Sequence, residues 1–500
     1  MFQQKYVEVL ALFSHSCSAL AVNRFHWDQG CVYCVQFSME PCFTKPNFSQ
    51  GAKLDAKADL SEAAKARGID FFLVAFVDLR GVLRTKMVPA SAIKQIQRDG
   101  AGFAPAATWL DFGPHAADLL VIPDASTLLQ VPFSPELAIV MGDCFIEGKE
   151  VAQSPRAVLK AQVAEAKKRG YVFKSGVEAE FFLLSDKDAI SDSRDTQSKP
   201  CYDAQSMMRR YALLADIVKT LNASGFGVYQ TDHEDANGQF EINWHYQDCL
   251  TTADQHVFFK WAVKTLSERH GFRATFMPRP FSNLSGNGCH IHCSLWAGDK
   301  NVFEASDTIS DLALQFLGGV LAKAPSYCAI TNPTVNSFKR LNGAATASGY
   351  TWSPNRVSWS GNNRSHMVRV PDNDRFELRL ADGAVNPYLL PAVMLACGFW
   401  GIDTKANPHK CLFPADVNMY EIPDGSPKLE GIASLPRNLL DATRALESDE
   451  HLTALLGADF LRAFVKLQKL EWTEFTAHLS NWEVSQLSVH RLQLLGRQRL

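Results

Sequence analysis

Hydrophobic and polar residues follow regular patterns from about residue 60, and these patterns predict four short elements. Asp59–Arg67 has the spacing of an amphipathic helix, and the next residue, Gly68, is of the type that commonly ends helices. The apolar run Phe71–Val77 predicts a strand, and a polar turn returns the chain as a second strand, Val82–Val88. A further helix is expected over Ala90–Arg98. The pattern therefore predicts a hairpin flanked by helices, which is typical of a small α+β domain.

A boundary signal follows at Ser154 and Pro155, because serine is a favoured helix N-cap and proline fits the first helical position. Apolar residues of the predicted helix share one face before Gly170 ends it. We therefore divide the chain into three parts: residues 1–50, a loosely ordered extension or an upstream translation artefact with the start near Met39; residues 51–153, an N-terminal domain; and residues 154–500, a larger domain.

Three segments of the larger domain place ionisable residues at every second position, so each predicted strand has one charged face and one apolar face. They are VEAEF at Val177–Phe181, CHIHC at Cys289–Cys293 and RFELR at Arg375–Arg379. Any one of them alone also fits a half-exposed surface strand. Together they carry Glu, His and Arg almost exclusively, whereas solvated strands usually mix Lys, Glu, Thr and Ser. This selection favours a site for hard cations and phosphates.

Two more carboxylates, Glu234 and Glu241, flank Asn237-Gly238, a dipeptide typical of a type I′ hairpin turn. Such a hairpin would bring the two ends of the segment together. Oxygen-rich ligation with a single imidazole favours Mg²⁺ or Mn²⁺ over structural zinc, which prefers cysteine.

The charges of these segments and of the neighbouring arginines cancel. Five glutamates face five arginines: Glu178, Glu180, Glu234, Glu241 and Glu377 against Arg340, Arg364, Arg369, Arg375 and Arg379. A nucleoside triphosphate with about four negative charges would be balanced by two divalent ions, a common arrangement where phosphoryl groups move. Arginine suits this task because its planar fork holds carboxylate or phosphate bidentately.

Composition excludes several other classes. The 500 residues carry a net charge of -3, so no general basic field favours nucleic acid or an anionic membrane as a partner. Gly383–Ile402 is the longest stretch without charge, but two prolines interrupt it, so we expect a buried helix and no membrane span. Most of the 12 cysteines are scattered singly, which favours reduced thiols in a cytoplasmic protein.

Six motifs, in this order along the chain, resemble the glutamine synthetase family. They are VEAEFFLL, HEDANGQFEIN, TFMPRPFSNLSGNGCHIHCSL, NPTVNSFKRL, NNRSHMVRVP and RFELRLADGAVNPYLLPA, and the similarity covers roughly four fifths of the chain. The resemblance implies an α+β fold: a small β-grasp-like N-terminal domain and a catalytic domain built on a curved antiparallel sheet flanked by helices. It also implies stacked rings, expected to be a dodecamer, with active sites shared between neighbours. The HEDANGQFEIN and SGNGCHIH versions look most like the bacterial type III branch, which includes glutamate–methylamine ligases.

The resemblance also assigns roles by position. The first metal site, beside the acceptor, corresponds to Glu180, Glu234 and Glu241, and the second, at the ATP phosphates, corresponds to Glu178, His290 and Glu377. The residues that contact the nucleotide correspond to His292 and Ser294. The arginines that hold the phosphates and the transferring group correspond to Arg364, Arg369 and Arg375. Of these, Arg364 and Arg375 are the expected catalytic residues. Glutamate contacts correspond to Arg340, Arg379 and the backbone at Gly286.

The chemistry that the family implies has two steps. The γ-carboxylate of glutamate attacks the γ-phosphate of ATP, and an amine then displaces phosphate from the acyl phosphate. Two or three Mg²⁺ or Mn²⁺ ions in each site bring these anions together. The expected function is glutamine biosynthesis from ammonia in nitrogen metabolism. The alternative is the same chemistry with a small alkylamine such as methylamine, which gives γ-glutamylmethylamide.

Two acids of the ammonia-specific members are missing, and both serve the amine. Ala104 stands where those members have an Asp that binds ammonium, and no Asp or Glu lies between Arg340 and Arg364, where they have a flap Glu. That loop carries Tyr350, Trp352 and Trp359, so an uncharged aromatic pocket for a less hydrated amine is one hypothesis. The other is that Asp111 or Asp118 of a neighbouring subunit supplies the charge.

Two positions differ from many members of the family, and two other functions are alternatives to ligation. Asn362 and Ser285 stand where many relatives have arginine and asparagine, and neither position is a metal ligand. A non-catalytic relative would be expected to have lost ligands, but all six matched metal ligands and five arginines are present. Phosphorylation of a guanidino or carboxylate substrate without ligation is distinguished by its stable phosphorylated product.

Overall fold

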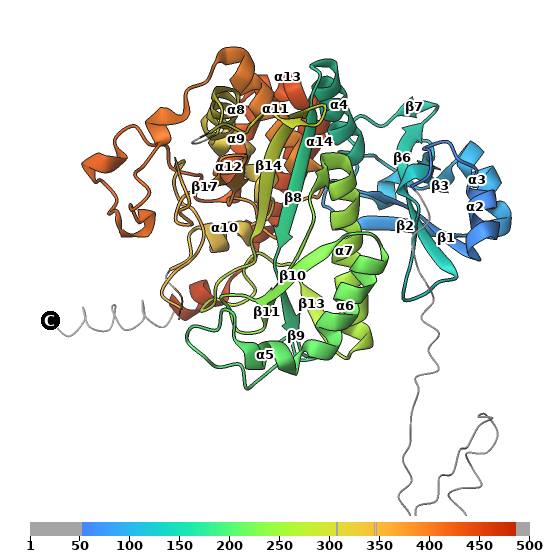
Figure 1. The fold of residues 1–500 in the computed structure, drawn as a ribbon, viewed down its shortest axis with the longest axis horizontal. Coiled ribbons are helices and arrows are strands. Elements are labelled where there is room, and N and C mark those ends of the chain that lie inside the picture. Colours follow the sequence, from blue (N-terminus) through green and yellow to red (C-terminus); the bar gives the residue numbers. More distant parts are fainter. Residues whose placement is uncertain (1–52, 307–308, 345, 347, 487–500) are drawn as a thin grey trace, which may run out of the picture. The chain divides into compact units, whose positions relative to one another are not determined.

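The computed structural model describes residues 53–306, 309–344, 346 and 348–486. The prediction for residues 1–50 lies outside these ranges. Sheets flanked by helices make up the described chain (Figure 1), which confirms the predicted α+β class. No helix among the described residues combines the length and the apolar character needed to cross a bilayer.

The N-terminal sheet is built on the predicted hairpin. Strands β1 (Phe71–Val77) and β2 (Leu83–Pro89) pair antiparallel, and β1 pairs parallel with β6 (Leu137–Ile146). The remaining strands of this sheet are β3 (Ala101–Phe103), β4 (Leu119–Pro123), β5 (Leu129–Gln130) and β7 (Lys149–Glu150).

Two helices accompany this sheet, α2 (Leu60–Arg67) and α3 (Ile93–Asp99). The Asp59 side chain caps α2, and Gly68 ends it with a φ of 66°, a conformation that glycine adopts without strain. The predicted helix Ala90–Arg98 is a 3₁₀ turn followed by α3.

A second sheet runs in the order β12-β8-β14-β18-β17-β16, with β15 paired to β14. All its pairs are antiparallel except β16 with β17. The bounds are β8 (Val172–Ala179), β12 (Gln247–Asp248), β14 (Cys289–Ala297), β15 (Lys300–Asn301), β16 (Trp359–Ser360), β17 (Val368–Asp372) and β18 (Arg375–Leu378). In β8, alternate residues are buried as the sequence pattern predicts.

A third sheet has the order β10-β11-β9-β13. Its strand β9 follows β8 in the chain, separated from it by one residue. Its strands are β9 (Phe181–Leu184), β10 (Val228–His233), β11 (Gln239–Trp244) and β13 (Arg273–Thr275). Glu180 lies between β8 and β9, and its N–H donates to the carbonyl of Gly288 at 3.2 Å. The prediction of one continuous strand over Val177–Phe181 is therefore wrong, because the chain passes from one sheet to the other at Glu180.

The predicted hairpin around Asn237-Gly238 exists, but its type I′ turn does not. Glu234–Gly238 forms a longer loop between β10 and β11, with Gly238 at a φ of 75° and Asn237 outside the positive-φ region. A type I′ turn would need positive φ at both residues. The Asp195 carboxylate instead holds this loop by accepting from Asn237 Nδ2 at 3.0 Å and from the Gly238 N–H at 2.6 Å.

The uncharged stretch Gly383–Ile402 contributes most of a buried helix, α11 (Leu389–Thr404), as predicted. Helix α8 (Asp311–Ala322) approaches it so closely that a Cβ on Gly319 would lie 2.1 Å from the Cys397 carbonyl oxygen. Only glycine fits there.

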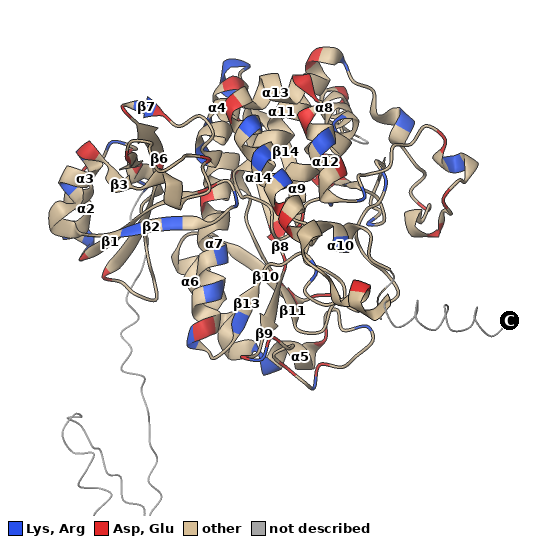
Figure 2. Ribbon diagram, turned by 180° about the vertical axis from the view of Figure 1, so that it is seen from behind, with Lys and Arg blue, Asp and Glu red and all other residues tan. Residues whose placement is uncertain are grey.

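The other helices flank the second and third sheets (Figure 1). They are α4 (Pro155–Lys168), α5 (Ala204–Arg209), α6 (Tyr211–Ala223), α7 (Cys249–Arg269), α9 (Ala324–Thr331), α10 (Ser337–Leu341), α12 (Leu439–Glu447), α13 (Glu450–Leu456) and α14 (Ala458–Ala477). Helix α4 begins at Pro155 as predicted, although the Ser154 side chain makes no capping hydrogen bond. Seen from behind, acidic and basic segments are interspersed over these helices (Figure 2).

Candidate active site

Strand β14 carries two histidines between two strands that each carry a glutamate. His290 stands directly opposite Glu178 of β8, and His292 stands directly opposite Glu377 of β18. Residues 290 and 292 point to the same face because side chains alternate along a strand. The register therefore brings four ionisable side chains from three strands together.

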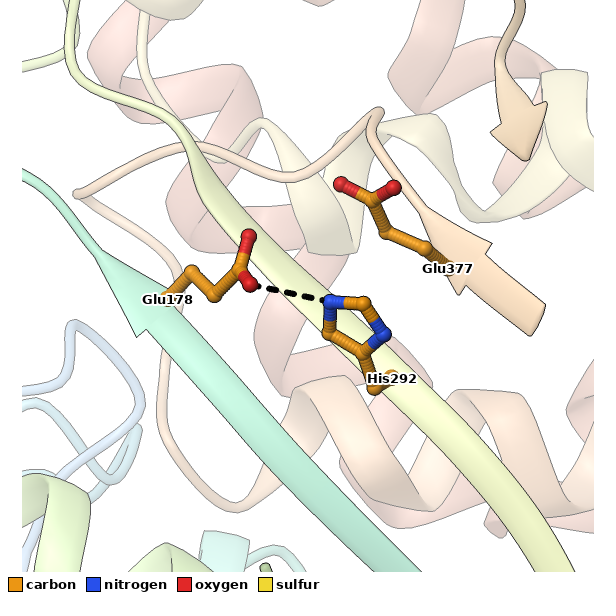
Figure 3. A group of neighbouring side chains, drawn as sticks. All are labelled: Glu178, His292 and Glu377. Carbon is orange, nitrogen blue, oxygen red and sulfur yellow. Dashed lines mark hydrogen bonds and ion pairs between the residues drawn. The ribbon is translucent and has the colours of Figure 1, made fainter. Parts of the chain in front are cut away.

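These four residues form the first carboxylate group. His292 Nε2 lies 3.0 Å from Glu178 Oε1 (Figure 3), and His290 Nδ1 lies 3.4 Å from Glu178 Oε2 and 3.5 Å from Glu377 Oε1. One ligand atom each of Glu178, His292 and Glu377 lies within 4.8 Å of the others. A single cation could reach these atoms, and both imidazoles are close enough to the carboxylates to take part.

Three more glutamates form the second carboxylate group. Ligand atoms of Glu180, Glu234 and Glu241 lie within 4.8 Å of one another. They come from the junction of β8 and β9, the loop after β10, and β11. The Glu180 carboxylate is fixed because its Oε2 accepts from Gln239 Nε2 and from the Gly288 N–H, each at 2.8 Å.

The second group concentrates negative charge. Burial and the neighbouring carboxylates, Glu180 foremost among them for Glu234 and Glu178 for Glu241, raise the pKa of both carboxyls well above the ordinary value. Burial, together with Glu178 and Glu180, also raises the pKa of Asp232 to about 6. Carboxylates held this close favour a divalent cation among them, and an all-oxygen donor set suits Mg²⁺ or Mn²⁺.

The first group has the opposite electrostatics. Burial alone would raise the pKa of Glu178, but hydrogen bonds with His290 and His292 bring it well below the ordinary value. Burial likewise opposes ionisation of Glu377, yet the charge of Arg379 foremost, followed by the two histidines, lowers its pKa to about 2. Imidazole hydrogen bonds and the charge of Arg379 therefore favour the ionised forms of these two carboxylates.

Arginines surround the first group. Arg379 and Arg369 donate to the two oxygens of Glu377 at 2.6 and 2.7 Å. Arg375 Nε lies 3.3 Å from His292 Nδ1. Arg364 is exposed, and no hydrogen bond or ion pair joins it to another described residue. Three of the five predicted arginines, Arg369, Arg375 and Arg379, therefore contact the first carboxylate group directly. A fourth, Arg340, contacts the backbone of Arg379.

The fourth of these arginines, Arg340, is buried and forms hydrogen bonds with the backbone that follows β18. It donates to the carbonyl oxygens of Leu380 and Arg379 at 3.0 and 3.4 Å. Gly286 is a site of close approach, since a Cβ there would lie 2.2 Å from the Pro278 carbonyl oxygen and 3.2 Å from Arg340 Cγ. Ser294 of β14 accepts from Trp296 Nε1 at 3.0 Å.

The structure divides the aromatic residues of the predicted amine pocket. The Tyr350 ring lies 5.3 Å from that of Trp352 and 6.3 Å from that of Tyr420. Trp359 belongs to β16 and is buried, with its Nε1 donating to the Pro408 carbonyl oxygen at 2.8 Å. Trp359 is therefore fixed by the core, and the aromatic group consists of Tyr350, Trp352 and Tyr420.

Sequence reasoning missed three acidic or aromatic residues here. Asp232 lies two residues before Glu234, so the alternation used for the other strands would have found it. Asp235 contacts the segment that carries Tyr350, and Tyr420 is more than fifty residues from that segment. Asp235 lies within the HEDANGQFEIN motif, but no local pattern indicated these long-range contacts of Asp235 and Tyr420.

The comparisons with known proteins agree with the motifs. Residues 152–487 match the model of the glutamine synthetase catalytic domain. A glutamine synthetase of Rhizobium leguminosarum bv. phaseoli is 51% identical over 431 residues, which cover 85% of this chain and 98% of that protein. A glutamate–methylamine ligase of Methyloversatilis universalis is 40% identical over 438 residues, which cover 86% and 98%. A solved GmaS/ADP complex is 50% identical with a TM-score of 0.80 and covers 85% and 98%.

Fold, site and relatives together define an enzyme of the ligase class. The chain belongs to the glutamine synthetase family, as its motifs predicted.

Proposed function

We propose that this chain is a glutamine synthetase, which activates the γ-carboxylate of glutamate with ATP and amidates it with ammonia. The observation that supports this most is the pair of carboxylate groups on either side of the strand break at Glu180. Phosphoryl transfer to a carboxylate requires two anions to meet, and this arrangement provides two places for cations within one charged region.

The roles of the residues follow the family pattern. One Mg²⁺ or Mn²⁺ ion is held by Glu180, Glu234 and Glu241. Another is held by Glu178, His290 and Glu377, and His292 is close enough to share this ion. When bound, these ions neutralise the phosphates and stabilise the charge of the transferring group. Arg340, Arg379 and the backbone at Gly286 bind glutamate, while His292, Ser294, Arg364, Arg369 and Arg375 bind the nucleotide and its phosphates.

Methylamine is the alternative acceptor, and it has support of its own. The aromatic pair Tyr350 and Trp352 carries no charge, and relatives of both names match over nearly the same length. Initial rates with ammonium and with methylamine at equal concentration, measured by ADP release and amide analysis, decide between the two. A strong preference for ammonium refutes the alkylamine version, and a stable phosphorylated product without amide refutes ligation altogether.

Several coarser features belong to the same proposal. The chain acts in the cytoplasm, with no nucleic-acid or membrane partner, and assembles into rings, expected to be dodecamers, whose subunits share active sites. Residues 51–153 form the N-terminal domain and residues 154–500 the catalytic domain, and the family match beginning at residue 152 supports this division. Light scattering of the purified chain tests the ring, because a monomer would contradict it.

A further inference from the structure

A carboxylate to which the family resemblance assigned no role joins the second carboxylate group to the segment bearing the aromatic pair. Asp235 follows Glu234, and its N–H donates to Glu234 Oε2 at 3.0 Å. Its own Oδ2 accepts from the hydroxyls of Ser285 and Ser348, each at 2.5 Å. Asp235 therefore contacts a proposed metal ligand through its backbone and the distant segment through its side chain.

The hydroxyls around Asp235 form a connected group. Thr346 Oγ1 lies 3.0 Å from Ser348 Oγ and 3.4 Å from Ser285 Oγ, and it donates to the Tyr350 carbonyl oxygen at 2.6 Å. Ser285 and Ser348 are buried, with 4% and 6% of their surface exposed. Hydrogen bonds to an ionised acceptor in such surroundings are stronger than those between neutral groups.

The segment held in this way carries strain and aromatic side chains. Trp352 has a φ of 54°, which is unusual for a bulky residue and persists only where contacts enforce it. Tyr350 packs against Tyr420, and Tyr420 in turn lies near enough to Arg340 and Arg379 to feel their charges, because they counter the rise that burial produces in its pKa. The segment is therefore held by Asp235 at one end and packs through Tyr350 against Tyr420.

Ser348 and Tyr350 also line a cavity of about 860 Å³. The segment would have room to move into this cavity if it were released from Asp235. The sequence offers no acid within the segment itself to hold it, since no Asp or Glu lies between Arg340 and Arg364.

We propose that Asp235 is a positioning residue for the amine step, holding Ser348 so that Tyr350 and Trp352 stay over the acceptor site and keep water out. This inference rests on the proposed function. Without the contact, the acyl phosphate is open to water, and hydrolysis returns glutamate and phosphate in place of the amide. Asp235, in the β10–β11 loop, thus replaces the acid that the segment itself lacks.

The test compares three variants of one segment in the full-length chain. Ser348→Ala removes the contact with Asp235, Ser348→Thr keeps a hydroxyl, and Ser353→Ala removes a buried hydroxyl whose single hydrogen bond among the described residues goes to the Thr351 carbonyl at 3.3 Å. For Ser348→Ala we expect the KM for the amine to rise roughly tenfold or more, as for a lost hydrogen bond to a charged group, with ADP formed in excess of amide. The KM for ATP should change less than about twofold.

The remaining outcomes separate the two proposals. Ser348→Thr is expected to restore the ratio of ADP to amide, and Ser353→Ala to leave it at the wild-type value. Equal kinetics of Ser348→Ala and Ser353→Ala, or equal changes in the KM of ATP and amine, would overturn the role of Asp235 while leaving the ligase function intact. A wild-type chain that forms no γ-glutamyl amide with either amine overturns both. Hydrogen exchange of Ser348–Ser353 provides a second measurement, which should accelerate in Ser348→Ala and Asp235→Ala but not in Ser353→Ala.

Discussion

The two carboxylate groups each contain one of the glutamates at positions 178 and 180, but they differ in how their charge is compensated. Around Glu178 and Glu377 the protein supplies imidazole hydrogen bonds and arginine charge, and the pKa values of both carboxyls are depressed. Around Glu234 and Glu241 acids face acids, and the pKa values are raised. The first group is therefore largely compensated before any ion binds, whereas the second depends on one. Folding and metal binding are expected to be coupled mainly through the second group.

Replacing Glu377 by glutamine gives the largest expected effect on stability. Its buried carboxylate pairs with Arg369 and Arg379, so the neutral side chain leaves two arginines without their partner. We expect the free energy of unfolding to fall by about 3–5 kcal/mol. Urea denaturation of the metal-free protein measures it, and a loss below about 1 kcal/mol would mean that solvent or a flexible partner compensates these arginines.

The matched change in the second group, Glu241→Gln, is expected to act in the opposite direction on stability. It removes one charge from a cluster of like charges, so the metal-free protein should be as stable as the wild type or more stable by about 1 kcal/mol. Amide formation should nevertheless fall about 100- to 1000-fold, as for other preorganised electrostatic sites. If this variant were as strongly destabilised as Glu377→Gln, the contrast between the two groups would be wrong.

The pH dependence of the metal-free protein should also separate the groups. A carboxyl whose folded pKa is raised contributes stability that is fully present below its unfolded value, 4.5 for Glu234 and Glu241, and that is lost as pH rises through the folded value. Glu178 and Glu377 behave oppositely, and their contribution is lost only as pH falls below 4.5, toward about 2 for Glu377.

Stability should therefore decrease as pH rises above 4.5 without metal, and the thermal shift produced by Mg²⁺ should grow with it. Differential scanning fluorimetry with and without EDTA measures both. A flat profile in EDTA, or one unchanged in Glu241→Gln, would contradict the raised pKa values.

The smallest expected effect concerns the aromatic residues. Trp359→Phe removes the hydrogen bond to the Pro408 carbonyl and part of a buried ring, so it should cost about 1–2 kcal/mol of stability and leave the ratio of rates with methylamine and ammonium unchanged. Trp352→Phe serves as its matched comparison, measured by the same assays. An altered amine preference in Trp359→Phe would mean that Trp359 does line the acceptor pocket.

Local patterns predicted much of the fold and of the site. The helix that ends at Gly68, the strand Phe71–Val77 and the charged faces of β8, β14 and β18 follow from residue type and spacing, and the structure bears them out. The family motifs added the identity of the enzyme class. That His290 holds the ion of the first carboxylate group stays a prediction, because both His290 and His292 approach the Glu178 carboxylate.

Long-range contacts set what the patterns could not supply. The dipeptide Asn237-Gly238 carries a strong turn signal, but Asp195, about forty residues away, bonds to both residues and imposes a longer loop. The same holds for Asp235, whose importance appears only through Ser348, 113 residues further along the chain. Alternation at Val177–Phe181 predicted the side-chain pattern, yet it held no information about a change of sheet at Glu180.

That change of sheet has a geometric consequence. Ala179 alone separates Glu178 from Glu180 in sequence, and these two glutamates belong to different cation groups. The distance between the two proposed ions is therefore set by a backbone span of two peptide units and depends little on the long loops elsewhere in the domain. Insertions in those loops can be tolerated during evolution, whereas adding or deleting one residue at position 179 would change the spacing of the ions themselves.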